Sequence, residues 1–305
     1  MDGLNLGPPA GDLPEVLIRI ARMEKRNRFA SLIGPPGLYL ILIFLLPIGV
    51  MFVYSFRAGI SGPAHDSFTL ANYQSFLVNS NFHRLLWRSA IISFTISVLS
   101  TLMAYPLAYY LVFRAGPNRV TLMTLLIIPT WTSYLLRIFS WKLILGSSGV
   151  LNSLLLSLGL IEKASPILIY SRGAVIVTLI YVWVPFVALP IFAALERIDK
   201  SLLEAAADLG CPAWEAFLRI TLPLSLPGIL AGFFFALIPT LGEFVTPLLV
   251  GGASGSMYGN LIQDQFMRAL NWPMGSVMSM AMLVAVLLLI FILTRLGSIA
   301  DLAGF

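Results

Sequence analysis

Residues 201–232 read SLLEAAADLGCPAWEAFLRITLPLSLPGILAG and interrupt an otherwise strongly apolar chain. Ser201, with Glu204 three residues later, is typical of a capping box that begins a helix. Gly210 fits the position just after a helix end, where a left-handed backbone closes the last turn. Pro212 suits the first turn of a following helix, where a missing N–H costs nothing. The stretch therefore predicts two short helices that meet at a glycine corner.

The second of these helices is expected to end at Pro223 and Pro227, which set the entry to a membrane span. Alanines at 205–207 keep the first helix slender enough to enter a groove on another protein. Larger apolar residues offer anchors for such docking: Leu203, Leu209, Trp214 and Phe217. By composition alone, an amphipathic loop that rests on lipid is an equal alternative.

The composition is that of an integral membrane protein. Of 305 residues, 58% are hydrophobic and only 11% are charged, whereas a soluble domain has about a quarter charged residues. The net charge of +5 indicates membrane topology and no nucleic-acid partner. Cys211 is the single cysteine, and His65 and His83 stand alone. The sequence therefore predicts no disulfide within the chain, no metal site and no cofactor.

Six windows free of charge are long enough to cross a bilayer, for which about 20 apolar residues are needed. The predicted spans are about 34–56, 89–113, 120–141, 173–195, 225–250 and 276–294. Residues 143–161 are also free of charge, but glycines, serines and an asparagine interrupt them. We interpret this stretch, and 258–275, as extracytoplasmic loops with short interfacial helices.

The orientation follows from lysine and arginine in the short loops. A cytoplasmic N-terminus places eleven of the 19 basic residues inside, including a cluster before the first span. We therefore expect both termini to be cytoplasmic. The predicted domains are a basic N-terminal segment (1–33), a transmembrane permease domain (34–294) that contains a cytoplasmic loop (195–224), and a cytoplasmic tail (295–305).

The spacing inside this loop resembles the EAA signature of ABC importer permeases, E-A-A-x3-G-x9-I-x-L-P. All seven fixed positions match: Glu204, Ala205, Ala206, Gly210, Ile220, Leu222 and Pro223. Longer stretches are similar to the spermidine/putrescine permease subfamily: 127–145, 179–210, 221–252 and 260–275. The polar segment 1–33 is not part of this resemblance.

The resemblance implies an all-α polytopic membrane protein with ABC type I importer permease architecture, in a bacterial inner membrane. It also implies two cytoplasmic ATP-binding subunits, a second permease that is a homologous but different chain, and an extracytoplasmic solute-binding protein. In such a complex the EAA loop is the coupling helix that docks on the ATPase, with Glu204 and Gly210 as chief contacts and Ala205, Ala206 and Asp208 beside them. The chain has no G-x-x-x-x-G-K-[ST] motif, so a partner hydrolyses ATP and this chain is not an enzyme.

Glu243 is the clearest candidate for the substrate pathway, because ionisable groups inside spans are costly and usually functional. It lies in PTLGEFVTP, in the outward part of the fifth span, where a carboxylate suits a cationic substrate. The alternative is an internal ion pair with Arg137 or Lys142. Those two cations are expected to extend to the outer interface instead.

Aromatic side chains offer organic cations a second kind of contact, through cation–π attraction. The candidates are Trp131, Tyr134 and Trp141 in the third span and Tyr181 and Trp183 in the fourth. Tyr134 and Trp141 are seven residues apart and share a helical face. For each of them, packing or a place at the membrane interface is the more common role.

The function expected from these features is import of a small organic cation, most simply a polyamine such as spermidine or putrescine. Another cargo for the same permease is the first alternative: an opine, an amino-acid derivative, betaine, a phosphonate or a metal complex. An ion-coupled secondary transporter would show charged or unwound helix pairs in two related halves, and no clear internal repeat is present. A membrane-embedded enzyme would show clustered His, Asp or Ser residues, which this chain lacks.

Overall fold

The computed structural model describes residues 13–59, 67–163, 165 and 168–302, and the side chains of these ranges except those of 13–30, 293 and 296–302. The described part is almost entirely helical. Its pairing of extended segments is limited to a bridge between Arg57 and Phe68. The first twelve residues of the predicted segment 1–33 and the last three of the predicted tail 295–305 lie outside the described residues.

The α-helices follow one another from the N-terminus to the C-terminus, and the shorter turns lie between them. The α-helices are α1 (Leu13–Ser55), α2 (Ala71–Val78), α3 (Ser80–Phe113), α4 (Arg119–Ile127), α5 (Tyr134–Leu145), α6 (Val150–Ser157), α7 (Arg172–Glu196), α8 (Lys200–Asp208), α9 (Ala213–Ala216), α10 (Leu222–Leu241), α11 (Gly252–Gly255), α12 (Tyr258–Met267) and α13 (Trp272–Leu302). Short 3-10 or π turns are η2 (Gly116–Asn118), η3 (Ile128–Trp131), η4 (Phe217–Thr221) and η5 (Pro247–Gly251).

Six helical stretches are long and apolar enough to cross a membrane, which confirms the predicted number. They are Ser31–Ser55, Ser80–Phe113, Tyr134–Ser157, Arg172–Glu196, Ala213–Leu241 and Trp272–Ile292. The third stretch joins α5 to α6 across a turn at 146–149. The segment α4–η3–α5, residues 119–145, contains the expected third span 120–141 and is broken at Pro129, which cannot donate a backbone hydrogen bond.

The centre of the bundle consists of α3, α7 and α10, which pack directly on one another. One face of α3 carries small buried residues that repeat every three or four positions: Ser89, Ser93, Ser97, Ser100, Ala104 and Ala108. Gly228 and Gly232 of α10 lie against α7, where a Cβ on Gly228 would meet the Pro190 carbonyl at 2.6 Å. Small residues allow helix backbones to approach closely in lipid.

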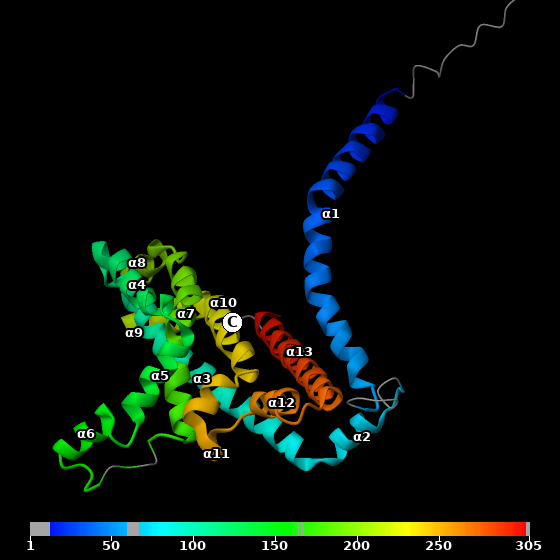
Figure 1. Cartoon of the computed structure of the whole chain (residues 1–305). Coiled ribbons are helices and arrows are strands. Elements are labelled where there is room, and N and C mark those ends of the chain that lie inside the picture. Colours follow the sequence, from blue (N-terminus) through cyan, green and yellow to red (C-terminus); the bar gives the residue numbers. More distant parts are fainter. Residues whose placement is uncertain (1–12, 60–66, 164, 166–167, 303–305) are drawn as a thin grey trace, which may run out of the picture.

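The first helix, α1, stands apart from this centre, as Figure 1 shows. It contacts chiefly α13, the last helix of the chain. Between Leu38 and Leu46 its apolar side chains are about half exposed or more. Such a surface requires lipid or another protein around it.

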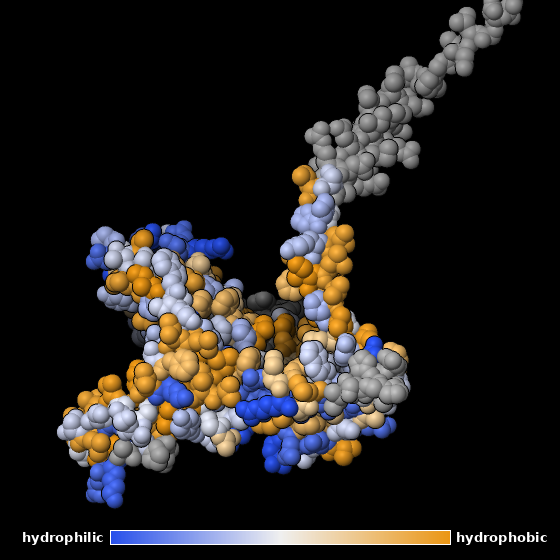
Figure 2. Space-filling model, in the orientation of Figure 1, coloured by the Kyte–Doolittle hydropathy of each residue, from blue (hydrophilic) through white to orange (hydrophobic). Residues whose placement is uncertain are grey.

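The bundle has two ends with different elements (Figure 1). The helices α8 and α9 and the start of α4 lie at one end, while α2, α6, α11 and α12 lie at the other. Polar residues gather at both ends and apolar residues cover the region between them, as Figure 2 shows. The stretches 143–161 and 258–275 each contain a short helix, α6 or α12, as predicted.

Candidate functional site

The EAA loop, defined here as residues 199–223, begins with a capped helix. Asp199 is the N-cap of α8, and its carboxylate accepts a hydrogen bond of 3.0 Å from the Ser201 N–H. The expectation that Ser201 is the cap, with Glu204 completing a capping box, is therefore wrong. The physical reason is that Asp is as good a cap as Ser, and Asp199 stands two residues earlier.

The cap makes the stability of α8 depend on pH. Hydrogen bonds from the backbone N–H and the hydroxyl of Ser201 hold the pKa of the Asp199 carboxyl below its usual range. A lowered pKa gives stabilisation that is present above the unfolded pKa and is lost as the pH falls through the folded one. We expect Asp199→Ala to lower the midpoint of thermal unfolding near neutral pH. Asp199→Asn should keep the cap but lose the acid dependence, which a comparison between about pH 6 and pH 3 would reveal.

Gly210 closes α8 as predicted, with a left-handed backbone at φ +76°. The N–H of Gly210 donates to the Ala207 carbonyl and the N–H of Cys211 donates to the Ala206 carbonyl, each at 2.9 Å. This pair of bonds is a Schellman motif, which satisfies the carbonyls at the helix end. The chain therefore turns sharply at Gly210 into the next helix.

The second part of the loop differs from the expectation. Pro212 is the N-cap of α9 and does not occupy its first turn. Pro223 and Pro227 do not end this helix, because α9, η4 and α10 form one helical stretch from Ala213 to Leu241. The π turn η4 lies directly before Pro223, and the Leu222 N–H bonds to the Phe217 carbonyl five residues back. Pro223 has no N–H to donate, but it lies in the first turn of α10, directly after the wider π turn. The helix therefore continues through this proline.

The EAA signature residues fall into two groups. Three of them are exposed at the α8 corner, Glu204, Ala205 and Gly210, and Asp208, which is not a signature residue, is exposed beside them. Ala206 is buried, and the later signature residues lie in η4 and at the start of α10: Ile220, Leu222 and Pro223. The first group presents a surface and the second group connects this surface to the fifth long helix.

The loop is anchored to α3, and the end of α7 just before the loop is anchored to α4. The Phe217 ring packs edge-on against the rings of Tyr105 and Tyr109 on α3, with centroids 5.8 Å apart in both cases. Arg119 at the start of α4 forms an ion pair of 3.0 Å with Glu196 at the end of α7. The loop is therefore held against α3 by Phe217 and continues directly into α10.

Glu243 lies where α10 has ended, in the short break before a helical turn that begins at Val245. Its Oε1 accepts hydrogen bonds from the Val245 and Thr246 N–H groups at 2.8 and 3.0 Å. Its Oε2 accepts a 2.6 Å hydrogen bond from the Tyr134 hydroxyl. The carboxylate therefore caps a helix and holds together two segments 109 residues apart.

The ion pair of Glu243 with Arg137 or Lys142, which was the alternative to a pathway role, is not formed between the described residues, and the Tyr134 hydroxyl bonds the carboxylate instead. Arg137 lies over the ring of the same tyrosine, with its Cζ 5.9 Å from the Tyr134 ring centroid. Its Nε is buried and has no hydrogen-bond partner in the described part of the chain. The Nε of Arg137 is therefore covered by protein, while the extension of its guanidinium to the outer interface stays a prediction.

The aromatic candidates separate into four environments. Tyr134 contacts Glu243, while Trp141 and Tyr181 pack edge to face with centroids 5.6 Å apart. Trp183 packs between the two central clusters of the core, and its Nε1 has no partner among the described residues. Trp131 is 81% exposed at the end of η3 and contacts none of the others.

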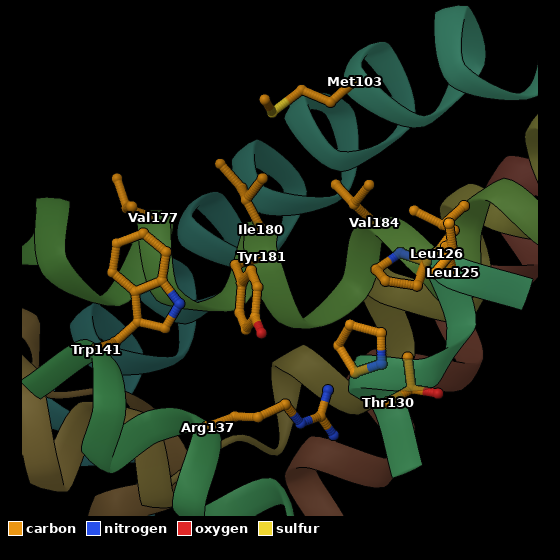
Figure 3. Close-up of a pocket in the computed structure, with 12 residues that line it drawn as sticks. Met103, Leu125, Leu126, Thr130, Arg137, Trp141, Val177, Ile180, Tyr181 and Val184 are labelled. Carbon is orange, nitrogen blue, oxygen red and sulfur yellow. The ribbon is translucent and has the colours of Figure 1, made fainter. Parts of the chain in front are cut away.

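A cavity of about 510 Å³ opens between α4, η3, α5 and α7. Figure 3 shows Trp141, Tyr181 and Arg137 along one side of it, with the Tyr181 hydroxyl and the Arg137 guanidinium pointing toward each other. Most of the remaining wall is apolar: Met103, Leu125, Leu126, Val177, Ile180 and Val184. A second cavity of about 400 Å³ shares Pro129, Arg137, Trp141 and Tyr181 with the first.

Sequence reasoning missed Thr246 as a member of this region and considered Arg137 only as an ion-pair partner of Glu243. The Thr246 hydroxyl lies 2.9 Å from the Tyr134 hydroxyl and completes the polar cluster around Glu243. The spacing of three between Tyr134 and Arg137 places both on one helical face and is the signal that could have linked them. No sequence pattern indicates that α5 and the segment after α10 meet.

Comparison with known proteins agrees with this geometry. Residues 75–302 match the family described as binding-protein-dependent transport system inner membrane component. The chain is 36% identical to the spermidine/putrescine transport system permease protein PotB of Haemophilus influenzae, over 86% of this chain and 92% of that protein. It is 34% identical to PotB of Escherichia coli, over 87% of this chain and 94% of that protein.

A bacterial ABC transporter involved in the import of the polysaccharide alginate has the same fold, with a TM-score of 0.69 and 19% sequence identity. The match covers 92% of this chain and 98% of that chain. The chain therefore belongs to the family of binding-protein-dependent transport system inner membrane components and is a multi-pass inner-membrane protein.

Proposed function

We propose that this chain is the permease subunit of an ATP-driven importer that moves a polyamine, such as spermidine or putrescine, into the cytoplasm. The observation that supports a polyamine as the cargo is the sequence identity to two PotB proteins, which extends over more than nine tenths of their length. The Glu243 carboxylate, placed at a helix break inside the bundle, supplies the negative charge that a polyamine requires. Its hydrogen bonds hold it in place.

The partners are two cytoplasmic ATP-binding subunits, a second permease that is a homologous different chain, and an extracytoplasmic solute-binding protein. The ATPase docks at the α8 corner, where Glu204, Ala205, Asp208 and Gly210 are exposed, and Ala206 packs beneath them. Ile220, Leu222 and Pro223 carry the movement into α10. The exposed apolar sides of α1 face lipid and the second permease.

This assignment gives the chain its orientation. The loop 195–224 then lies in the cytoplasm, as do both termini with the segment 1–33 and the tail 295–305. The third crossing consists of α4, η3 and α5, and α6 and α12 lie on the extracytoplasmic side. The cargo passes the polar cluster of Tyr134, Glu243 and Thr246 and the neighbouring cavity lined by Trp141 and Tyr181. Trp131 is exposed at the surface, and Trp183 packs in the core of the bundle.

The test is ATP hydrolysis by the complex reconstituted in liposomes with its binding protein and a panel of putrescine, spermidine, betaine, a phosphonate and an opine. Stimulation by the polyamines alone is the expected result. Stimulation by an anionic or zwitterionic ligand instead would keep the permease role and discard the polyamine. A second outcome concerns the mechanism. If transport stays intact after removal of residues 201–223, the ABC mechanism itself would be discarded.

Glu243→Gln is expected to weaken direct binding of putrescine by about tenfold, because one ion pair in a partly buried site is removed. Glutamine still offers an oxygen to the Val245 and Thr246 N–H groups, so the helix cap should survive. Tyr134→Phe removes a hydrogen bond and no charge, so a smaller loss is expected. Equilibrium binding of radiolabelled putrescine to the detergent-purified importer measures both, and equal affinity in Glu243→Gln and the unaltered chain would contradict the pathway role.

A further inference from the structure

The carboxylate of Glu243 depends for its position on a short turn between two helical stretches. This segment, residues 242–244, lies between the end of α10 and the helical turn that begins at Val245, and we call it the Glu243 turn. Two of the hydrogen bonds of the carboxylate come from the Val245 and Thr246 N–H groups. These two bonds orient the carboxylate on its own turn. They do not determine where the turn stands in the bundle.

Asn260, in the first turn of α12, connects the Glu243 turn to that helix. Its Nδ2 donates a 2.7 Å hydrogen bond to the Phe244 carbonyl, and its Oδ1 accepts a 3.0 Å hydrogen bond from the Met257 N–H. An asparagine amide that bonds a carbonyl at one end and an N–H at the other can take only one orientation. Because Asn260 is 8% exposed, water has little access to either bond. The side chain therefore holds the Glu243 turn at a fixed distance from α12.

The backbones of the two segments also lie in direct contact. A Cβ added to Gly259 would lie 2.7 Å from the carbonyl oxygens of both Gly242 and Glu243. Any side chain at this position would displace the turn, so the close approach depends on a glycine. The first turn of α12 is therefore the surface on which the Glu243 turn rests.

This part of α12 is itself fixed to two long helices. The Tyr258 N–H donates a 2.7 Å hydrogen bond to the Ser89 Oγ on α3. The Tyr258 hydroxyl donates a 3.1 Å hydrogen bond to the Met278 carbonyl on α13. Tyr258 is fully buried, so both bonds lie inside the bundle. Through Asn260, the position of the Glu243 turn is thus referred to α3 and α13 as well as to α10.

We propose that Asn260 is a positioning residue that sets the place of the Glu243 carboxylate for a cationic cargo. The inference rests on the proposed function, because it takes Glu243 as the cation site of the pathway. The Phe244 carbonyl also accepts a 3.1 Å hydrogen bond from the Leu248 N–H, so this group keeps a partner without Asn260. The amide is therefore not needed to satisfy the carbonyl. Its contribution is to hold the turn in register with α12.

A double-mutant cycle tests whether Asn260 acts through Glu243. Equilibrium binding of radiolabelled putrescine is measured on the detergent-purified importer without its solute-binding protein, for the unaltered chain, Asn260→Ala, Glu243→Gln and the double variant. We expect Asn260→Ala to weaken binding about fivefold in the unaltered chain, the usual scale for one lost hydrogen bond. In the Glu243→Gln background the same change should leave the affinity within about twofold, because the charge whose place it sets is absent. Equal factors in the two backgrounds, or no loss in the unaltered chain, would overturn the inference.

Asn152→Ala is the matched control. Asn152 is also a buried asparagine, and its amide bonds the Gly146 carbonyl and the backbone of Ser165 rather than the Glu243 turn. This variant should lower the midpoint of thermal unfolding, but the affinity for putrescine should stay within about twofold. An equal loss of affinity in both alanine variants would mean that any loosening of the fold weakens binding, which would contradict a specific role of Asn260.

Asn260→Ser is the milder variant, for use if Asn260→Ala does not fold. Serine keeps an oxygen that can accept a bond from the Met257 N–H, but its side chain is too short to reach the Phe244 carbonyl. It should weaken putrescine binding about threefold. If Glu243→Gln leaves binding intact, the proposed cation site fails and this inference fails with it. If Glu243→Gln weakens binding while neither Asn260 variant does, the cation site stands and only the positioning role is lost.

Discussion

Gly210→Ala is expected to lower ATP-driven uptake by tenfold or more while the protein still reaches the membrane. Gly210 has φ +76°, and a residue with a Cβ loses about 1–2 kcal/mol in this left-handed conformation. The corner between α8 and α9 then opens, and the exposed surface around Glu204 changes its angle to the bundle. Because geometry at a coupling contact must be held closely, a small rotation removes the coupling.

Gly159→Ala is the matched control for this change. Gly159 follows α6 at φ +68°, and like Gly210 it has open space where a Cβ would be placed. It carries the same backbone strain at the opposite end of the bundle. Uptake into liposomes measures both variants, and equal losses in the two would show that general strain, rather than the α8 corner, lowers transport.

Gly228→Ala is expected to destabilise the folded chain by about 1–3 kcal/mol, the usual cost of overpacking. A Cβ at this position would lie 2.4 Å from the Ala194 Cβ and 2.6 Å from the Pro190 carbonyl oxygen. The second contact is with backbone, so α10 must move away from α7. Separation of these two helices opens the centre of the bundle, and thermal unfolding in detergent should show a lower midpoint.

Gly49→Ala provides the comparison, since Gly49 lies within α1 and no atom is within 4 Å of its added Cβ. This variant should unfold at the same temperature as the unaltered chain or slightly higher, because alanine favours a helix. Ala194→Gly should relieve only part of the Gly228→Ala defect, since the carbonyl contact remains. Full recovery would indicate that the backbones are not fixed at this crossing.

The number of long helices and the place of the EAA loop could be predicted from the sequence, because both depend on local patterns. Runs without charge identify spans, and the left-handed Gly210 follows from the preference of helix ends for glycine. The same local reasoning failed at Ser201, where two good caps stand two residues apart, and at Pro223, where a π turn lets the helix continue. Which residue caps α8, and whether the helix continues through Pro223, depends on small differences in free energy between similar backbone conformations.

The polar cluster could be predicted only in part. Glu243 was a candidate because a carboxylate inside a span is unusual. Its partner could not be identified, since Tyr134 is distant in sequence and several cations and hydroxyls were equally plausible. Arg137 was assigned to the outer interface because long basic side chains usually reach water. The break at Pro129 instead creates a cavity beside it, and a cavity is a property of packing rather than of a motif.

The separation of α1 from the rest of the chain has a consequence for biogenesis. α1 is synthesised first, and the helix that it chiefly contacts, α13, is synthesised last. At ordinary rates of translation the interval between them is roughly ten to forty seconds. During this time most of α1 is surrounded by lipid and by the insertion machinery, although its end at Ser55 already bonds Asn72 and Tyr73 of α2. Nascent chains that stop before α13 therefore leave an unprotected apolar helix, which membrane proteases and chaperones can recognise as an incomplete product.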